Sequence, residues 1–140
     1  MSKDTFALHP QLSADTFPVG DWPLCRVLRM NDRGFPWLIL VPRVADIREI
    51  IELPEADQQR LMSEIARASR ALSTLLRPDK LNVAALGNAV PQLHVHVIAR
   101  FKTDPAWPRP IWGVKPAEPF DATAAELEMA RLRTALAPFQ

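Results

Sequence analysis

The sequence predicts an α+β domain with an antiparallel sheet of about five strands, one main helix and a C-terminal helix. Three observations carry this prediction: a turn-linked pair of aliphatic segments, a long amphipathic stretch after it, and a second pair of strand-like segments. The resulting order of strand, strand, helix, strand, strand is typical of α+β domains.

The length of 140 residues suits a single domain over residues 1–140, and 48% hydrophobic with 24% charged residues is an ordinary globular composition. We expect the core over about residues 1–105. A proline- and tryptophan-rich arm and the last helix should occupy about residues 106–140.

The charge pattern disfavours some classes of partner. Seventeen basic residues against sixteen acidic ones leave a net charge of +1, and Lys and Arg form no long run. We therefore expect no nucleic-acid binding and no anionic membrane surface as partner. The start of the chain has no apolar stretch of signal-peptide length, and nowhere do about 18 apolar residues follow one another. These features predict a cytoplasmic protein.

The first two strands are expected over residues 24–30 and 37–41, which are rich in aliphatic side chains. The turn-forming residues NDRG at 31–34, with Pro36 just after them, join the two segments as a hairpin. The single cysteine, Cys25, excludes an internal disulfide and is expected to be a buried, unreactive thiol.

The main helix should begin at Pro54, because proline is tolerated in a first turn and the acidic Glu55 and Asp57 favour the positive end of the helix dipole. It should end at Arg77, which precedes Pro78. Apolar residues recur between these ends at helical spacing, at Leu61, Ile65, Ala68, Leu72 and Leu75.

The second hairpin is expected from strands over residues 81–86 and 92–101 with a tight connection over 87–91. Residues 102–119 contain five prolines, which favours a stiff, ordered arm of irregular backbone. Asp121 should cap the last helix. One face of that helix is apolar, at Ala125, Met129, Leu132 and Leu136.

The most informative motif is QLHVHVI at residues 92–98, in which Gln92, His94 and His96 alternate with aliphatic residues. In a strand, this spacing sends all three polar side chains to one face, with neighbours roughly 6.5 to 7 Å apart. Two imidazoles at that distance can address adjacent atoms of one substrate group. We therefore regard the three residues as candidate catalytic residues.

Imidazole chemistry suits attack on phosphorus. A neutral histidine keeps a free lone pair near pH 7 and is a usable nucleophile. A second imidazole on the same face, if protonated, can donate to a phosphate oxygen and stabilise the developing charge. Such a site needs neither a metal nor a cofactor.

Two other interpretations of the histidine pair remain open. A bare His-x-His pair more often decorates a solvated sheet face than it forms a site. Alternatively, His94 and His96 could bind one zinc ion, but zinc needs at least three protein ligands. The other candidate ligands, His9 and Cys25, lie in unrelated segments, and elemental analysis of the purified protein would decide the question.

The motif resembles that of the histidine-triad (HIT) superfamily, in which three histidines alternate with apolar residues; Gln92 takes the first triad position here. The resemblance covers roughly residues 24–101. It includes VLRMN at 27–31 and WLILVP at 37–42, followed by a helix and a strand in the family's order.

This resemblance implies a small α+β fold, a homodimer, and hydrolysis or transfer of a nucleoside monophosphate from a nucleotide substrate. By position, His94 would attack the α-phosphate and form a nucleotidyl-histidine, and His96 would bind the phosphate oxygens. Gln92 can form hydrogen bonds but carries no charge near neutral pH. The alternative is a nucleotide-binding module with weak or no turnover.

The resemblance also implies substrate-binding roles. Asn31 lies where family members contact the ribose, and Asn88 lies in the connection from which they contact the phosphates, although both residues equally suit turns. Ala89 stands where many relatives have serine or threonine. We leave Arg43 and Arg100 outside the site, since a solvated charge at a strand end needs no special cause.

Three further residues have mainly structural interpretations. Trp107 and Trp112 could stack on a base, but core packing or a subunit contact is the commoner role for each. His9 is expected to be solvated. Neither the base, the leaving group nor the physiological substrate follows from the sequence, because fold-level likeness does not fix the shape of a pocket.

Overall fold

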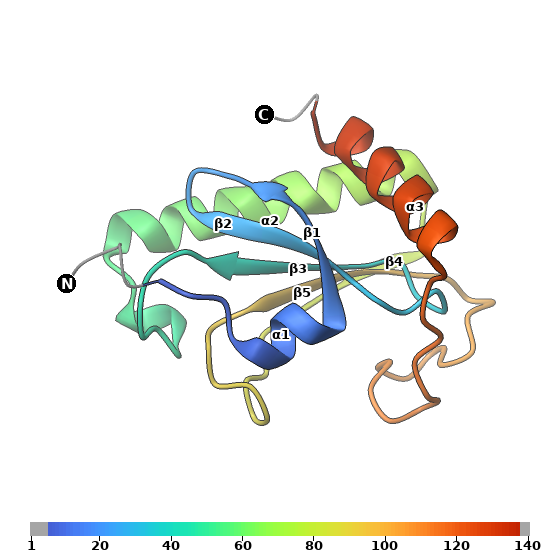
Figure 1. Cartoon of the computed structure of the whole chain (residues 1–140), viewed down its shortest axis with the longest axis horizontal. Helices are drawn as coiled ribbons and strands as arrows, with labels where there is room; N and C mark the ends of the chain where they lie inside the picture. The colour runs from blue at the N-terminus through green and yellow to red at the C-terminus, as the bar shows by residue number, and fades with distance from the viewer. Residues whose placement is uncertain (1–5, 138–140) are drawn as a thin grey trace.

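In the computed structural model, which describes residues 6–137, the chain forms a five-stranded antiparallel sheet with the order β1-β2-β3-β5-β4 (Figure 1). The fold-class prediction is confirmed. The strands are β1 (Thr16–Asp21), β2 (Cys25–Met30), β3 (Trp37–Pro42), β4 (Lys80–Ala84) and β5 (Val95–Arg100). The helices are α1 (Pro10–Asp15), the short 3-10 turn η2 (Ile50–Glu52), α2 (Glu55–Leu76) and α3 (Ala122–Leu136).

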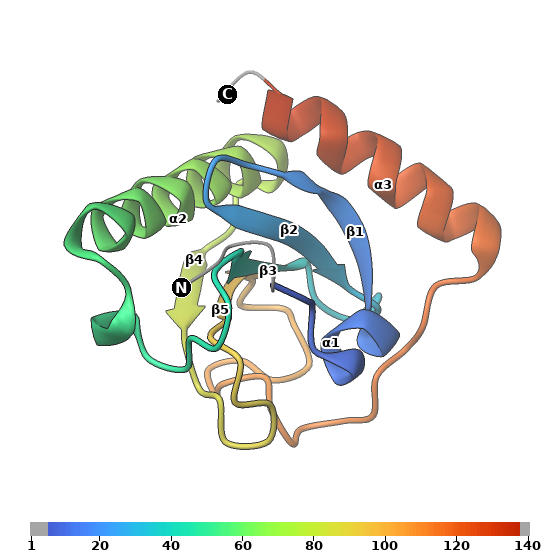
Figure 2. The same ribbon diagram turned by 60° about the vertical axis from the view of Figure 1, so that its left-hand side comes forward.

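Both faces of the sheet are covered, but by different kinds of structure. Helices α2 and α3 lie on one side, whereas α1 and the irregular segment after β5 lie on the other (Figures 1 and 2). Alternate side chains of β5 follow this division: Val95 and Val97 join the core beneath the helices, and Ile98 joins the core beneath the irregular segment. His96 therefore belongs to the face that is covered by α1 and the irregular segment (Figure 1).

The first hairpin is confirmed, since β2 and β3 pair antiparallel with Cys25 opposite Pro42. Cys25 is fully buried, and burial raises the pKa of its thiol, in agreement with an unreactive side chain. The buried carboxylate of Glu64, on α2, accepts hydrogen bonds from the backbone N–H groups of Leu24 and Cys25 at 2.9 and 2.8 Å. The main helix is thereby fixed to the start of β2.

The predicted helices are also confirmed. Helix α2 starts directly after Pro54 and ends before Arg77, whose φ of 50° is left-handed and terminates the helix. In α3, the Asp121 side chain accepts a hydrogen bond from the Ala124 N–H as the predicted cap. Among residues 6–137, none of the helices combines the length and apolarity needed to span a membrane.

Helix α1, strand β1 and the short turn η2 were not predicted. Helix α1 and strand β1 occupy residues 10–21, and β1 contains Pro18 and Gly20, which both disfavour a strand interior. The structure accommodates them because β1 is an edge strand, and its register with β2 shifts between these two residues.

The strand predicted over residues 92–101 is shorter, because β5 begins at Val95. The preceding backbone is engaged elsewhere: Pro91 has no N–H to donate, and the Leu93 N–H donates to the Ile47 carbonyl at 2.9 Å. Similarly, β4 ends at Ala84 and not at residue 86. His94 consequently lies in the connection between β4 and β5, directly before the first residue of β5.

The arm over residues 102–119 contains neither a helix nor a strand, as predicted, and it is tied to the end of β5. The Arg100 guanidinium forms a two-bond ion pair with Asp104 at 2.8 and 3.1 Å and also donates to the Asn82 side chain at 2.7 Å. Asp104 in turn accepts from the Trp107 N–H. The arm is therefore ordered by a buried charge network.

Candidate active site

His94 and His96 lie side by side, with ring centroids 5.0 Å apart and the ring planes at 71°. Both residues are buried, with exposed fractions of 7% and 4%. His94 is the last residue before β5, and His96 is the second residue of that strand, opposite Ile39 of β3. The structure therefore brings the two predicted histidines together.

The protonation of His94 is set by a backbone carbonyl. Its Nδ1 lies 2.7 Å from the carbonyl oxygen of Gln92. Because a carbonyl oxygen only accepts hydrogen bonds, Nδ1 carries the proton in the neutral ring, and the lone pair is on Nε2. A histidine that acts as a nucleophile through Nε2 needs this tautomer.

His96 has the opposite tautomer. The indole N–H of Trp37 donates to His96 Nδ1 at 2.9 Å, so the proton of the neutral ring lies on Nε2. Burial, followed by the charge of His94, lowers the pKa of His96 to about 4. The condition of a protonated second imidazole is therefore not met near pH 7, where His96 is neutral and can donate through its Nε2–H.

The lowered pKa of His96 predicts a loss of stability in acid. The unfolded chain takes up a proton near pH 6.5, whereas the folded chain resists it until about pH 4. Stability is therefore full above pH 6.5 and falls by about 3 kcal/mol towards pH 4 from this group alone. Urea unfolding at pH 7.5 and pH 4 would measure the loss.

The matched control for this measurement is His96→Asn, because asparagine can still accept from Trp37 but does not titrate. The difference in unfolding free energy between the two pH values should be smaller in this variant by about the same 3 kcal/mol. An equal loss in both proteins would show that His96 is not the titrating group.

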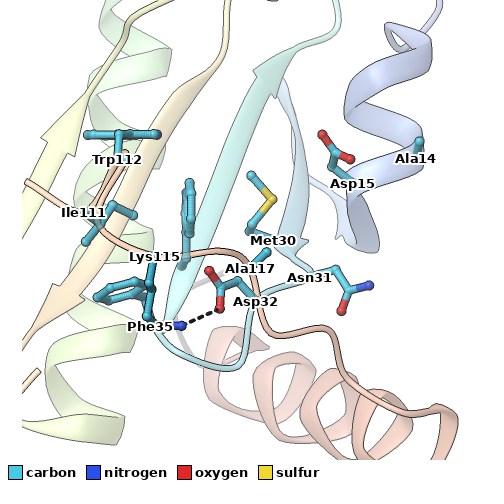
Figure 3. Close-up of a pocket in the computed structure, with 12 residues that line it drawn as sticks. Ala14, Asp15, Met30, Asn31, Asp32, Phe35, Ile111, Trp112, Lys115 and Ala117 are labelled. Carbon is cyan, nitrogen blue, oxygen red and sulfur yellow. Dashed lines mark ion pairs between the residues drawn. The ribbon is translucent and has the colours of Figure 1, made fainter. Parts of the chain in front are cut away.

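A cavity of about 320 Å³ lies between the end of β2 and the arm (Figure 3), and neither His94 nor His96 is among its lining residues. Trp37 and Trp112 line it, and the Trp112 ring meets the rings of His96 and Trp37 edge-on at 5.1 and 6.0 Å. Trp112 is 38% exposed. The arm thus supplies an aromatic side chain to the wall of the cavity, and this side chain contacts His96.

The opposite side of this cavity is polar. In Figure 3, Asp15 and Asn31 lie across the cavity from Trp112. The Asn31 side-chain oxygen accepts a hydrogen bond from the Phe120 N–H at 2.8 Å. The buried Asp32 accepts from the Gly34 N–H, and its carboxylate lies 3.9 Å from the Lys115 ammonium.

A second cavity, of about 270 Å³, is lined by His94 itself. Its other walls include Gly87 of the connection before β5 and the apolar side chains of Ile50, Ile51 and Leu86. Asn88 is exposed and follows Gly87 directly. His94 thus lines the second cavity, whose aliphatic walls are joined by Arg48 and Glu49, whereas the first cavity has aromatic and polar walls and is reached from His96 through its contacts with Trp37 and Trp112.

Gln92 precedes β5, and its side chain is bonded to the N-terminal segment. Its side-chain oxygen accepts from the His9 N–H at 2.8 Å, and its side-chain NH₂ donates to the Ala7 carbonyl at 2.9 Å. His9, predicted to be solvated, is half-buried and caps α1 by accepting from the Gln11 N–H. The polar group next to His94 is therefore the backbone carbonyl of Gln92.

Two arginines keep structural roles. Arg100 is buried and paired with Asp104, and Arg43 donates to the Trp22 carbonyl at 2.6 Å. The expectation that Arg100 is a solvated charge is wrong, although it does lie outside the site. Metal-ligating clusters of three or more His, Cys, Asp or Glu side chains do not occur in the part of the chain that the structure describes.

Trp37, Asp15, Asp32 and Lys115 were missed as site residues by sequence reasoning. Trp37 was recognised only as the start of a strand. The sequence contains one indication that Trp37 lies near the histidines. Trp37 belongs to the WLILVP segment and stands two residues before Ile39, which pairs with His96. That pairing cannot be known before the strand order is known.

The comparisons with known proteins agree with the fold. A family model described as a HIT domain matches residues 11–103. A histidine triad protein from Bradyrhizobium japonicum is 52% identical over 94% of this chain and 98% of its own, with a TM-score of 0.90. One from Marinobacter aquaeolei is 50% identical over 96% of this chain and 98% of its own, with a TM-score of 0.93.

A histidine triad protein from Sinorhizobium meliloti is 44% identical over 96% of this chain and 99% of its own, with a TM-score of 0.91. The search of curated proteins gives no match. The similar solved structures extend beyond the family model and cover the arm and α3 as well.

Proposed function

This chain belongs to the HIT family, and from that membership we propose that it is a nucleotidyl hydrolase or transferase acting at the α-phosphate of a nucleotide. The observation that carries the proposal is the pair of complementary tautomers. His94 offers a lone pair at Nε2, and the adjacent His96 offers an N–H at Nε2.

The first chemical step uses the lone pair of His94. Nε2 attacks the α-phosphorus, a P–N bond forms, and the bond from phosphorus to the leaving group breaks with its electron pair. The His94 ring becomes positively charged while its Nδ1–H continues to donate to the Gln92 carbonyl, which stabilises that charge. The Nε2–H of His96 donates to a phosphate oxygen.

The second step returns the enzyme to its starting state. A water molecule attacks the phosphorus of the nucleotidyl-histidine and releases one proton to the solvent, the P–N bond breaks with its electron pair going to Nε2, and the nucleoside monophosphate leaves. His94 regains its neutral form with Nε2 free. If an alcohol or an amine replaces the water, the same step transfers the nucleotidyl group.

The cavity between β2 and the arm suits the nucleoside. Trp37 and Trp112 give it aromatic walls, and stacking of a base on such a surface contributes about 1 to 3 kcal/mol. Asp15 and the NH₂ group of Asn31 offer an acceptor and a donor to ribose hydroxyls or base edges. Asn88, beside Gly87, would meet the phosphates. The leaving group could be a second nucleotide or an amine, as in dinucleoside polyphosphates or phosphoramidates.

A homodimer is part of the proposal. Strand β4 is an outer strand of the sheet, and Val83 on it is 49% exposed. A second copy of the chain would cover this edge.

The proposed function is tested by a panel of such substrates assayed without added metal. We expect release of a nucleoside monophosphate, and in rapidly quenched samples a protein mass increased by one nucleotidyl group that maps to His94. A lack of turnover and of adduct with every substrate would overturn the proposal.

The second candidate function is a nucleotide-binding module with weak turnover. It is favoured by the presence of Gln92 and Ala89 where relatives have histidine and serine or threonine. Calorimetric binding of a nucleoside monophosphate, together with no product from any substrate in the panel, would support this alternative.

A further inference from the structure

Gln92 uses its side chain and its backbone in two different directions. The side-chain amide spans alternate backbone groups of the N-terminal segment, accepting from the His9 N–H at 2.8 Å and donating to the Ala7 carbonyl at 2.9 Å. The backbone carbonyl of the same residue lies 2.7 Å from His94 Nδ1. A single residue thus connects the start of the chain to the candidate nucleophile.

The sheet does not fix this carbonyl. Gln92 and His94 both precede β5, which begins at Val95, and the intervening Leu93 donates its N–H to the Ile47 carbonyl. The position of the Gln92 carbonyl therefore depends on the loop contacts at residues 92 and 93. The side-chain amide makes two of the three hydrogen bonds involved.

We propose that Gln92 is a positioning residue: its amide, bound between Ala7 and His9, holds the Gln92 carbonyl against His94 and so keeps the Nε2 lone pair of His94 free. This inference rests on the proposed function of His94 as the nucleophile. Gln92 itself touches no reacting atom in this proposal. The same contacts give the N-terminal segment a role in setting the active site.

The chemistry of the amide explains why glutamine suits this position. A carboxamide presents one acceptor and one donor side by side, which matches an N–H and a carbonyl on alternate residues of a chain. The two nitrogens of an imidazole point in divergent directions, and a carboxylate has acceptors only. We therefore expect Gln92→His not to raise turnover above that of the wild type.

The most informative variant is Gln92→Glu. The side chain of glutamate has nearly the same shape as that of glutamine, but it can donate a hydrogen bond only when its carboxyl group is protonated. The introduced carboxyl group cannot donate to the Ala7 carbonyl when it is ionised, whereas it can when it is protonated. At pH 8 we expect kcat about tenfold below that of the wild type, the equivalent of one lost hydrogen bond, with KM changed less than about twofold. The ratio of variant to wild-type kcat should rise as the pH falls towards 5.

A second, independent readout is the tautomer of His94, measured by nitrogen-15 NMR. In the wild type the ring should be protonated at Nδ1. In Gln92→Glu at pH 8 a population protonated at Nε2 should appear. A residue that merely supported the fold would lower the melting temperature without changing this population.

The N-terminal side of the contact offers a matched pair of variants. His9 has a φ of −54°, which proline can adopt, so His9→Pro removes the N–H that donates to Gln92 without imposing a new backbone angle. His9→Ala also removes the imidazole that accepts from the Gln11 N–H, but it keeps the backbone N–H of residue 9. We expect His9→Pro to lower kcat several-fold further than His9→Ala, with no recovery at low pH.

The outcomes distinguish this inference from the proposed function. A wild-type tautomer and wild-type kcat in Gln92→Glu at pH 8 would overturn the inference, as would a Gln92→His variant faster than the wild type. Failure of the wild type to turn over any substrate would defeat the proposed function. The tautomer measurement would still decide whether Gln92 positions His94.

Discussion

Replacing His94 with glycine is expected to lower nucleotidyl transfer by at least about a thousandfold, because the variant retains the binding groups but has no nucleophile. A loss of this size corresponds to about 4 kcal/mol of transition-state stabilisation. The deletion also leaves a ring-sized space beside His96. Steady-state and single-turnover rates with the best substrate of the panel would measure the effect.

Added imidazole provides an internal control for this variant. A free imidazole that enters the vacated space should restore part of the turnover, and the restored rate should saturate with imidazole concentration. His96→Asn is the matched comparison, since it keeps the nucleophile and should retain more activity than His94→Gly. Full activity in His94→Gly without imidazole would refute the role of His94.

The largest expected effect on stability is that of Arg100→Met. The side chains of Arg100 and Asp104 are 2% and 7% exposed, and the guanidinium holds the pKa of Asp104 down at about 2. Removing the arginine leaves the Asp104 carboxylate and the Asn82 side-chain oxygen without their cation. We expect a loss of about 3 kcal/mol of unfolding free energy, or roughly 10 °C in melting temperature.

Arg26→Met is the matched control, because Arg26 forms a similar ion pair with Asp21 in an exposed setting, with side chains 33% and 44% exposed. Loss of this exposed ion pair should lower the unfolding free energy by less than about 1 kcal/mol. Chemical unfolding of the three proteins at pH 7 would compare them. Equal effects of the two substitutions would contradict the importance of the buried network.

Elements with a strong apolar period were predictable from the sequence. Helix α2 lies within a residue of its predicted ends, because Pro54 and Pro78 limit it and its buried face repeats every three or four residues. Helix α3 was found for the same reason, with Asp121 as its cap. In contrast, β1 was missed because Pro18 and Gly20 obscure its pattern, which an edge strand tolerates.

The candidate site was predictable only in part. The two histidines are separated by one residue in the sequence, so their proximity follows from the local backbone alone. The contact of Trp37 with His96 depends on β5 lying between β3 and β4, an arrangement that no local pattern encodes. The strand was predicted to begin three residues before its true start, and the bonding of the Gln92 side chain to the N-terminal segment was not predicted.

The uneven covering of the sheet has a consequence for how proteins of this shape can diversify. Helices α2 and α3 account for most of the packing on one face, whereas the pocket face is finished by the arm that carries Trp112. If the proposed nucleotide site lies in this cavity, changes in the arm would alter ligand selectivity while the helical layer stays intact. We expect that exchanging the arms of two homologues would exchange their ligand selectivity with little change in the stability of the helices and the sheet.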